Sequence, residues 1–160
     1  MTAEFPPGLL LIVGAILVPF IKGNLRSVYM LVLPLLGILQ LMASEPGTFG
    51  TMSTYGVELT HVRIDKLSLL FGYIFYISAA LGILFAWHRE DRVEQTSALV
   101  HAGAAIGAVF AGDLITLFFY WEVTAISSGV IIWAGRTNRS HGAGFRYLII
   151  QILSGILLLT

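Results

Sequence analysis

The stretch LITLFFYWEVTAISSGVIIWA, residues 114–134, is apolar enough for lipid except for one carboxylate near its middle. At a rise of 1.5 Å per residue, its 21 residues span about 31 Å, the thickness of a hydrocarbon core. An acid at the centre of a membrane helix costs about 2.5–3.5 kcal/mol on insertion scales, so Glu122 is a functional-site hypothesis. The alternative is a glutamate that only bonds a neighbouring helix or subunit.

The rest of the chain also has the composition of a membrane protein. Of its 160 residues 57% are hydrophobic and 11% are charged, against about 25% charged residues in an ordinary soluble domain. Nine Lys and Arg balance nine Asp and Glu, so the net charge does not indicate nucleic acid as a partner. The sequence contains no cysteine, which excludes disulfides, thiolate metal sites and Cys-ligated iron–sulfur clusters. We expect no cofactor and no metal.

Apolar segments separated by short polar ones predict an all-α integral membrane protein with about six transmembrane helices. We expect these helices over Phe5–Ile21, Val28–Ala43, Leu67–Trp87, Thr96–Gly112, Leu114–Ala134 and Gly144–Thr160, in a single membrane domain of residues 1–160. In the connection 44–65, a rough alternation of apolar and polar residues is compatible with a short hairpin.

The basic residues are concentrated in alternate connections. Seven of the nine fall between the first and second, third and fourth, and fifth and sixth segments: Lys22, Arg26, Arg89, Arg92, Arg136, Arg139 and Arg146. The positive-inside rule places these connections in the cytoplasm. The amino terminus is then expected outside the cell.

Two further polar residues in or near the membrane are candidates for function. Asp113 precedes the fifth segment, where its side chain can accept hydrogen bonds from the first turn as an N-cap; a part in proton uptake from the outer surface is the alternative. His101, in the fourth segment, either bonds across helices as a neutral imidazole or belongs to a proton relay.

Helical periodicity predicts the surroundings of these residues. Gly103 and Gly107 have the GxxxG spacing that lets two helix backbones approach closely. A rotation of 100° per residue places Thr124 and Ser128 beside each other, away from the Glu122 side. That side also carries Phe118, Phe119, Ala125, Ile126 and Gly129. Glu122 is therefore expected to look at a neighbouring helix or a small water pocket.

Such an acid can serve as a switchable proton site. Burial disfavours the charged form of a carboxyl, whereas a nearby lysine ammonium favours it, so a change in the distance between them moves a proton. Lys22 lies at the end of an apolar segment and Lys66 at the start of one. A basic partner within the membrane must therefore come from outside these 160 residues.

Several motifs in this chain carry a family resemblance. Residues 112–159 resemble the fourth-to-sixth helix region of the antiporter-like family, which includes membrane subunits of respiratory complex I, of membrane-bound hydrogenases and of Mrp-type multisubunit sodium/proton antiporters. The D-type member of the Mrp antiporters is the most similar. The matching motifs are GDL at 112–114, Tyr120-Trp121-Glu122, Arg146-Tyr147-Leu148, and Ile64-Asp65-Lys66-Leu67-Ser68 at the start of the third helix.

The resemblance implies that Glu122 matches the family's fifth-helix glutamate, which works with a lysine on a later helix to move protons. It implies an ion-translocating subunit without a redox centre rather than an enzyme. The implied partners are the lipid bilayer and other subunits of a multisubunit antiporter or respiratory-type complex, with protons and sodium or another monovalent cation as cargo.

The resemblance also implies a multi-pass protein of a bacterial or archaeal cell membrane with its amino terminus outside. Because family members have more helices, we expect a truncated or split subunit. Two departures stand out: Lys66 occupies a position where Gly is common, and His101 matches no family motif. The alternative function is a structural or assembly subunit whose Glu122 pairs with a neighbouring subunit.

Overall fold

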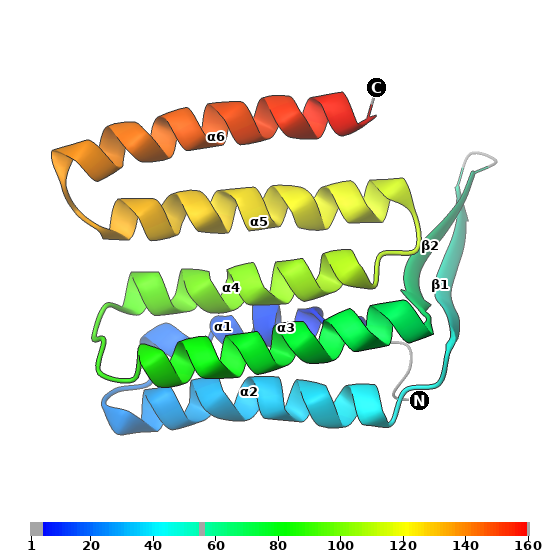
Figure 1. The fold of residues 1–160 in the computed structure, drawn as a ribbon, viewed down its shortest axis with the longest axis horizontal. Coiled ribbons are helices and arrows are strands. Elements are labelled where there is room, and N and C mark those ends of the chain that lie inside the picture. The colour runs from blue at the N-terminus through cyan, green and yellow to red at the C-terminus, as the bar shows by residue number, and fades with distance from the viewer. Residues whose placement is uncertain (1–4, 55–56, 160) are drawn as a thin grey trace.

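A computed structural model of the chain describes residues 5–54 and 57–159. Within these ranges the fold is mainly helical, as predicted, and long helices run side by side (Figure 1). In chain order the elements are α1 (Leu9–Ala15), the 3-10 helix η1 (Val18–Phe20), α2 (Asn24–Met42), the strands β1 (Gly47–Thr54) and β2 (Val57–Ile64), α3 (Lys66–Phe85), α4 (Arg92–Val109), α5 (Leu114–Ala134) and α6 (Asn138–Leu159).

Four of the described helices are long and apolar enough to cross a membrane: α2, α3, α5 and α6. The helix α4 falls short because its first turns are polar, with Arg92, Glu94 and Gln95. The helix α1 has only 7 residues. The count of about six spans therefore stays a prediction.

The first apolar segment is not one helix over 5–21, as the sequence suggested. The α-helix stops at Ala15, and a 3-10 turn with Pro19 follows. Proline has no N–H to donate, and its ring clashes with the carbonyl four residues earlier, so an α-helix cannot run through Pro19 undisturbed.

Two helices begin earlier than their apolar pattern because polar side chains cap them. Asp91 accepts hydrogen bonds from the N–H groups of Val93 and Glu94 at 2.9 and 3.2 Å, so α4 begins at Arg92. Thr137 Oγ1 accepts from the Ser140 N–H at 2.9 Å, and the Ser140 hydroxyl oxygen accepts from the Thr137 N–H at 2.9 Å. This reciprocal cap starts α6 at Asn138.

The hairpin that the alternating pattern allowed is present. Strands β1 and β2 pair antiparallel, in a register that runs from Gly47 opposite Ile64 to Thr54 opposite Val57. Val62 and Ile64 are buried, and the Arg63 N–H donates to the carbonyl oxygen of Phe110 at 2.9 Å. The hairpin is thereby joined to the end of α4.

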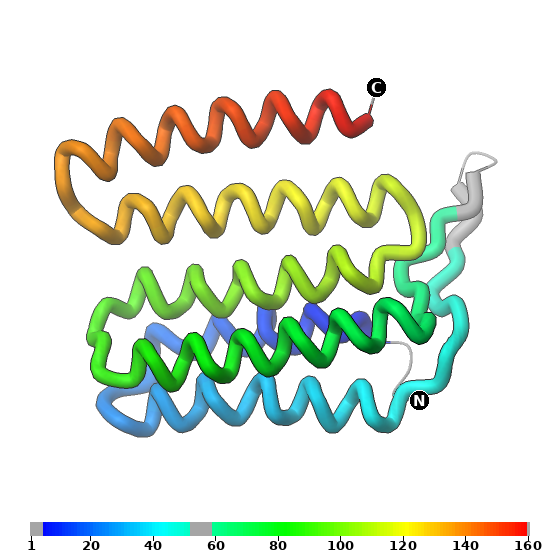
Figure 2. Tube along the Cα trace, viewed as in Figure 1, coloured from blue at the N-terminus to red at the C-terminus, as the bar shows by residue number. Residues whose placement is uncertain are grey.

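The helices form a bundle in which α5 lies between α4 and α6, and α4 also contacts α1 and α3 (Figures 1 and 2). The buried core lies among α1 to α4. Its fully buried large side chains include Leu11, Leu41, Tyr76, Leu99, Ile106 and Phe110.

Glycines permit the closest contact in this core, between α1 and α4. A Cβ built on Gly103 would lie 2.7 Å from the Gly8 carbonyl oxygen, and a Cβ on Gly8 would collide with the backbone of Gly103 and Gly107. The GxxxG spacing therefore does bring two backbones together, as predicted.

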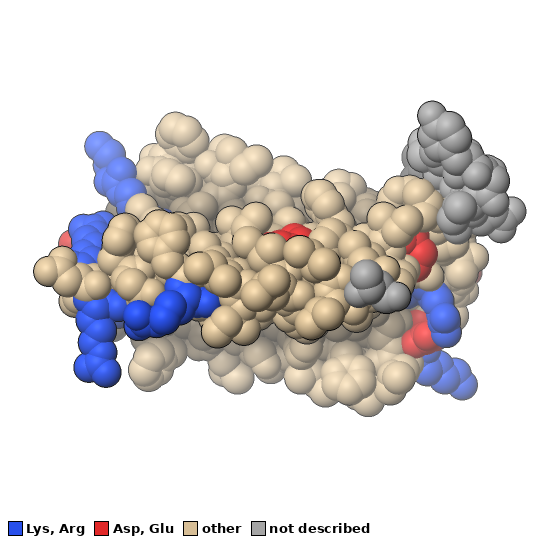
Figure 3. Space-filling model, turned by 90° about the horizontal axis from the view of Figure 1, so that it is seen from above, with Lys and Arg blue, Asp and Glu red and all other residues tan. Residues whose placement is uncertain are grey.

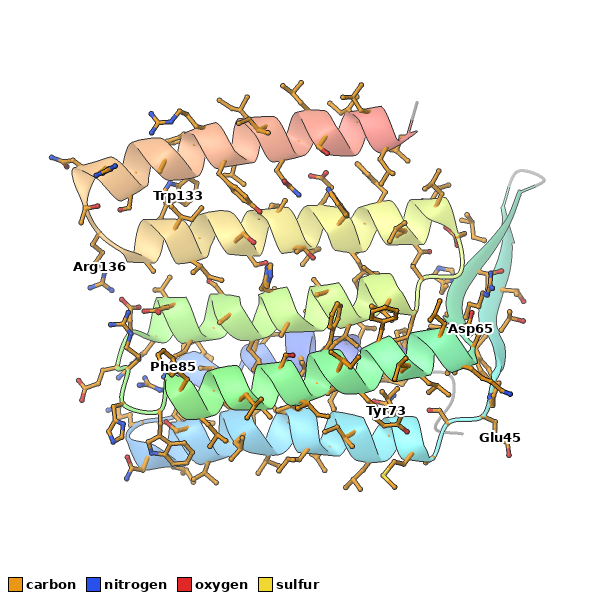
Figure 4. The ribbon with its side chains drawn as sticks, in the orientation of Figure 1. Glu45, Asp65, Tyr73, Phe85, Trp133 and Arg136 are labelled. Carbon is orange, nitrogen blue, oxygen red and sulfur yellow. The ribbon has the colours of Figure 1, made fainter. Side chains whose placement is uncertain are left out.

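Charged residues gather at the two ends of the bundle (Figure 3). Figure 4 shows Arg136 at the end where α5 passes into α6, and Glu45 and Asp65 at the opposite, hairpin end. Arg136 forms a 2.8 Å ion pair with Asp91, which joins the α5–α6 connection to the α3–α4 connection. Near the hairpin end, Gln40 Nε2 donates to the Phe5 carbonyl at 2.8 Å. Phe5 therefore lies opposite the basic connections.

This arrangement makes a labelling prediction. Because basic connections stay in the cytoplasm, Arg139→Cys is expected to resist a membrane-impermeant thiol reagent on intact cells and to react after the cells are opened. Glu45→Cys, in the hairpin-end connection, should react on intact cells. The natural sequence has no cysteine, so neither experiment has a background signal. Labelling of Arg139→Cys on intact cells would overturn the orientation.

Candidate functional site

Glu122 lies midway along α5 and packs against α6. A Cβ built on Gly155 of α6 would collide with Glu122 Oε1 and would lie 3.1 Å from the ring of Phe118. Only glycine at position 155 leaves room for the carboxyl group at this distance between the helices. The Glu122 side chain thus looks at a neighbouring helix, which is one of the two surroundings that its helical periodicity predicted.

One oxygen of this carboxyl group is buried without a partner. Oε1 of Glu122 has no hydrogen-bond partner among the described residues, although the residue as a whole is only half-buried. A buried acceptor left unpaired costs about 1–3 kcal/mol, and more when it is charged. The site therefore favours a neutral, protonated carboxyl group unless a cation comes close.

The face of α5 that carries Glu122 is divided between protein and lipid. A Cβ on Gly129 would lie 2.9 Å from Leu148 of α6, so Gly129 and Phe118 lie with Glu122 against α6. Phe119 and Ile126, in contrast, are 65% and 58% exposed. Acidic surface is visible midway along an otherwise apolar molecule in Figure 3.

His101 belongs to a separate polar cluster between α4 and α5. Its Nδ1 lies 3.0 Å from Ser128 Oγ, 3.4 Å from Ser127 Oγ and 3.3 Å from the Thr124 carbonyl oxygen. Both serine hydroxyls donate to that carbonyl, at 3.0 and 2.8 Å. Their oxygens remain free to accept, which suits an imidazole with its proton on Nδ1.

The structure does not bring His101 and Glu122 together. His101 contacts the side of α5 that faces α4, whereas Glu122 contacts α6. A role for His101 in a proton relay stays a prediction. The adjacency of Thr124 and Ser128 was expected, but their contact with His101 was not. Hydroxyls one turn apart on α5 and a histidine within α4 were the available signal.

Asp113 is the N-cap of α5, as predicted. Its carboxylate accepts from the Thr116 N–H at 2.7 Å and from the Thr116 hydroxyl at 3.0 Å. Burial raises the pKa of this carboxyl, but hydrogen bonds from Thr116 and from the backbone of Thr60 and Ile115 outweigh burial, so the net pKa is below the ordinary value. Thr60 belongs to β2, so the cap also holds the hairpin. A role for Asp113 in proton uptake stays a prediction.

The cap leads to a stability prediction. Asp113→Ala is expected to lower the free energy of unfolding by about 1 kcal/mol, since the first turn of α5 loses its acceptor, whereas Asp113→Asn keeps an acceptor and most of the stability. Because the folded pKa is depressed, the ionic part of this stability is present above the unfolded pKa of about 3.9 and is lost as pH falls through the folded pKa.

Detergent-solubilised protein unfolded at neutral and acidic pH would measure this loss. Equal stability of Asp113→Ala and the natural chain at neutral pH would contradict the capping role.

Metal ligation has no support in this part of the chain. Among residues 5–54 and 57–159, no group of three or more His, Asp or Glu side chains lies close enough to hold a metal ion. The candidate chemistry of the site is therefore that of a single buried acid.

The fold and its composition define an all-α membrane protein with one extramembrane hairpin, and a carboxyl group lies between two of its helices. In sequence the chain is similar to subunits of sodium/proton antiporters. The A-type subunit of the Na(+)/H(+) antiporter of Alkalihalophilus pseudofirmus is 29% identical over 91% of this chain. The A1-type subunit of the Na(+)/H(+) antiporter of Staphylococcus aureus is 29% identical over 70%.

The chain spans 20% and 15% of the length of these two relatives. No protein-family model matches the chain. Both relatives are antiporter subunits of type A, whereas the sequence motifs favoured type D. The similarity is to transporter subunits of multisubunit membrane complexes, and it supports the antiporter-like resemblance at that level.

Proposed function

We propose that this chain is part of a proton-translocating, cation/proton antiporter subunit of a multisubunit membrane complex, with Glu122 as its intramembrane proton-transfer site. The observation that carries the proposal is the buried Oε1 of Glu122 without a partner among the described residues, against Gly155. Similarity to antiporter subunits of type A supports the transporter class. The assignment to type D rests on the motifs alone.

The proposed site alternates between two protonation states. With α6 packed on it, the carboxyl group is neutral, because no cation from the described residues balances a buried charge there. A lysine ammonium within about 4–6 Å would favour the ionised form and release the proton. Lys22 and Lys66 lie near the ends of the bundle. The basic group is therefore supplied by another part of the complex.

The proposed setting follows from the same arguments. The cargo is protons and sodium or another monovalent cation, and the partners are the bilayer and other subunits of an antiporter or respiratory-type complex. The location is a bacterial or archaeal cell membrane with the amino terminus outside. His101 is a proposed relay group, and Asp113 a proposed point of proton uptake at the hairpin end.

The alternative is a structural or assembly subunit in which Glu122 pairs with a neighbouring subunit. The half-exposed position of Glu122 beside α6 is compatible with such a pair. The substitution Glu122→Gln separates the two functions. Loss of exchange in an assembled complex supports proton transfer, and loss of assembly supports the structural role.

A further inference from the structure

Two adjoining hollows lie at the end of the bundle that carries the basic connections. The first, of about 190 Å³, lies between α2, α3 and α4, and its lining is largely apolar, with Met30, Ile83 and Leu99 among its residues. The second, of about 300 Å³, is polar and includes Arg26, Trp87 and Arg89. Ser27 and Arg89 line both hollows, so the polar one opens beside the apolar one.

A buried arginine without full pairing lines the polar hollow. Arg26 is only 6% exposed, its Nη2 donates to the Glu90 carbonyl at 3.4 Å, and its Nε has no hydrogen-bond partner among the described residues. A buried guanidinium with an unused donor is costly, and it is suited to an oxyanion that can accept from several N–H groups at once.

The charges around this hollow favour an anion. Arg26, Arg89 and Arg92 line it together with one acid, Glu90. Glu94, which lines the apolar hollow, lies 3.5 Å from Arg89, but both side chains are substantially exposed, so water and salt weaken this pair. The Arg92 guanidinium donates to the Pro19 carbonyl at 3.2 Å, a neutral acceptor that leaves its charge unbalanced.

Gln95 provides a second buried polar group at the same place. It is 5% exposed, its Nε2 donates to the Arg89 carbonyl at 2.8 Å, and its Oε1 has no partner among the described residues. Gln95 lines the apolar hollow beside Arg89. An acceptor for a hydroxyl group is therefore available next to the basic cluster.

We propose that these hollows together bind one anionic phospholipid, with its phosphate at Arg26, Arg89 and Arg92 and part of an acyl chain in the apolar hollow. A free phosphate would satisfy the arginines, but it would leave the apolar hollow unfilled; a phospholipid fits both. The site lies at the end of the membrane helices, beside Trp87, where lipid headgroups and interfacial tryptophans are found.

The test is lipid binding to the purified full chain in detergent, measured by native mass spectrometry with phosphatidylglycerol and phosphatidylcholine. Phosphatidylglycerol is expected to bind more tightly. Arg89→Gln should weaken its binding about tenfold, because one charged hydrogen-bonding partner of the phosphate is lost. Gly82→Leu should weaken it similarly, since a Cβ at Gly82 meets no atom within 4 Å and the new side chain enters the apolar hollow.

Matched controls lie elsewhere in the chain. Arg139→Gln removes the same charge at the same end without touching either hollow, and Gly142→Leu adds the same side chain in α6, where a Cβ would meet only Arg146, at 3.7 Å, among the described residues. Both should bind phosphatidylglycerol like the natural chain.

Equal binding of the two lipids, or natural affinity in both Arg89→Gln and Gly82→Leu, would overturn the proposal. A third outcome would also overturn it: inorganic phosphate bound in an Arg89-dependent way, with lipid binding unaffected by Gly82→Leu, would define a site for free anions. Because Arg26 is buried, Arg26→Gln is informative only if its circular dichroism matches the natural chain. The other two variants decide the question without it.

Discussion

Replacement of Glu122 with glutamine is expected to abolish cation-driven proton exchange by the assembled complex. Glutamine has nearly the same shape and fits against Gly155, but it cannot take up or release a proton. Positioned proton-transfer groups typically contribute about 10²–10⁴-fold to a rate, so exchange should fall at least about a hundredfold. Dissipation of a proton gradient after addition of sodium or another monovalent cation to everted membrane vesicles would measure it.

Assembly is the second measurement on this variant. Because Glu122→Gln removes a buried acid that lacks a partner among the described residues and keeps its volume, the complex is expected to assemble to the natural level. Glu94→Gln, at the basic end of α4, is a control that removes one carboxylate outside the site. Natural exchange activity in Glu122→Gln would exclude the proton-transfer role, and a complex that fails to assemble would favour the structural alternative.

The largest expected effect on stability belongs to Gly103→Ala. The added Cβ would lie 2.7 Å from the Gly8 carbonyl oxygen, 2.8 Å from Ile12 Cγ1 and 2.9 Å from Leu11 Cβ. Backbone atoms cannot turn away as a flexible side chain can, so α1 must move from α4. Overpacking of this kind costs about 1–3 kcal/mol of unfolding free energy. Denaturant unfolding of the chain in detergent, followed by circular dichroism, would measure the loss.

Gly82→Ala is the matched control, because it makes the same change within α3 at a place where the new Cβ meets no atom within 4 Å. Alanine is a better helix former than glycine by up to about 1 kcal/mol, so this variant should be as stable as the natural chain or more stable. If Gly103→Ala and Gly82→Ala unfold at the same denaturant concentration, the close approach of α1 and α4 is wrong.

Local patterns were enough to predict much of this protein. The helix Leu114–Ala134, the acid at its centre and the cap at Asp113 each depend on residues close together in sequence. The alternate placement of basic connections predicted which connections share one end, and the Arg136–Asp91 ion pair joins two of them. Hydropathy, charge and helix caps act over a few residues, so a single sequence contains them.

The contacts between helices were decided only by the tertiary structure. Nothing near Glu122 in sequence indicates that Gly155 covers its carboxyl group, that His101 meets Ser128 on the other side of α5, or that Arg26 is buried between the helices. The reason is physical: lipid and a neighbouring helix are both apolar surroundings, so hydropathy cannot distinguish the face of a helix that meets protein from the face that meets lipid. That distinction depends on how each helix is rotated and placed against the others, and those contacts join residues far apart in the chain.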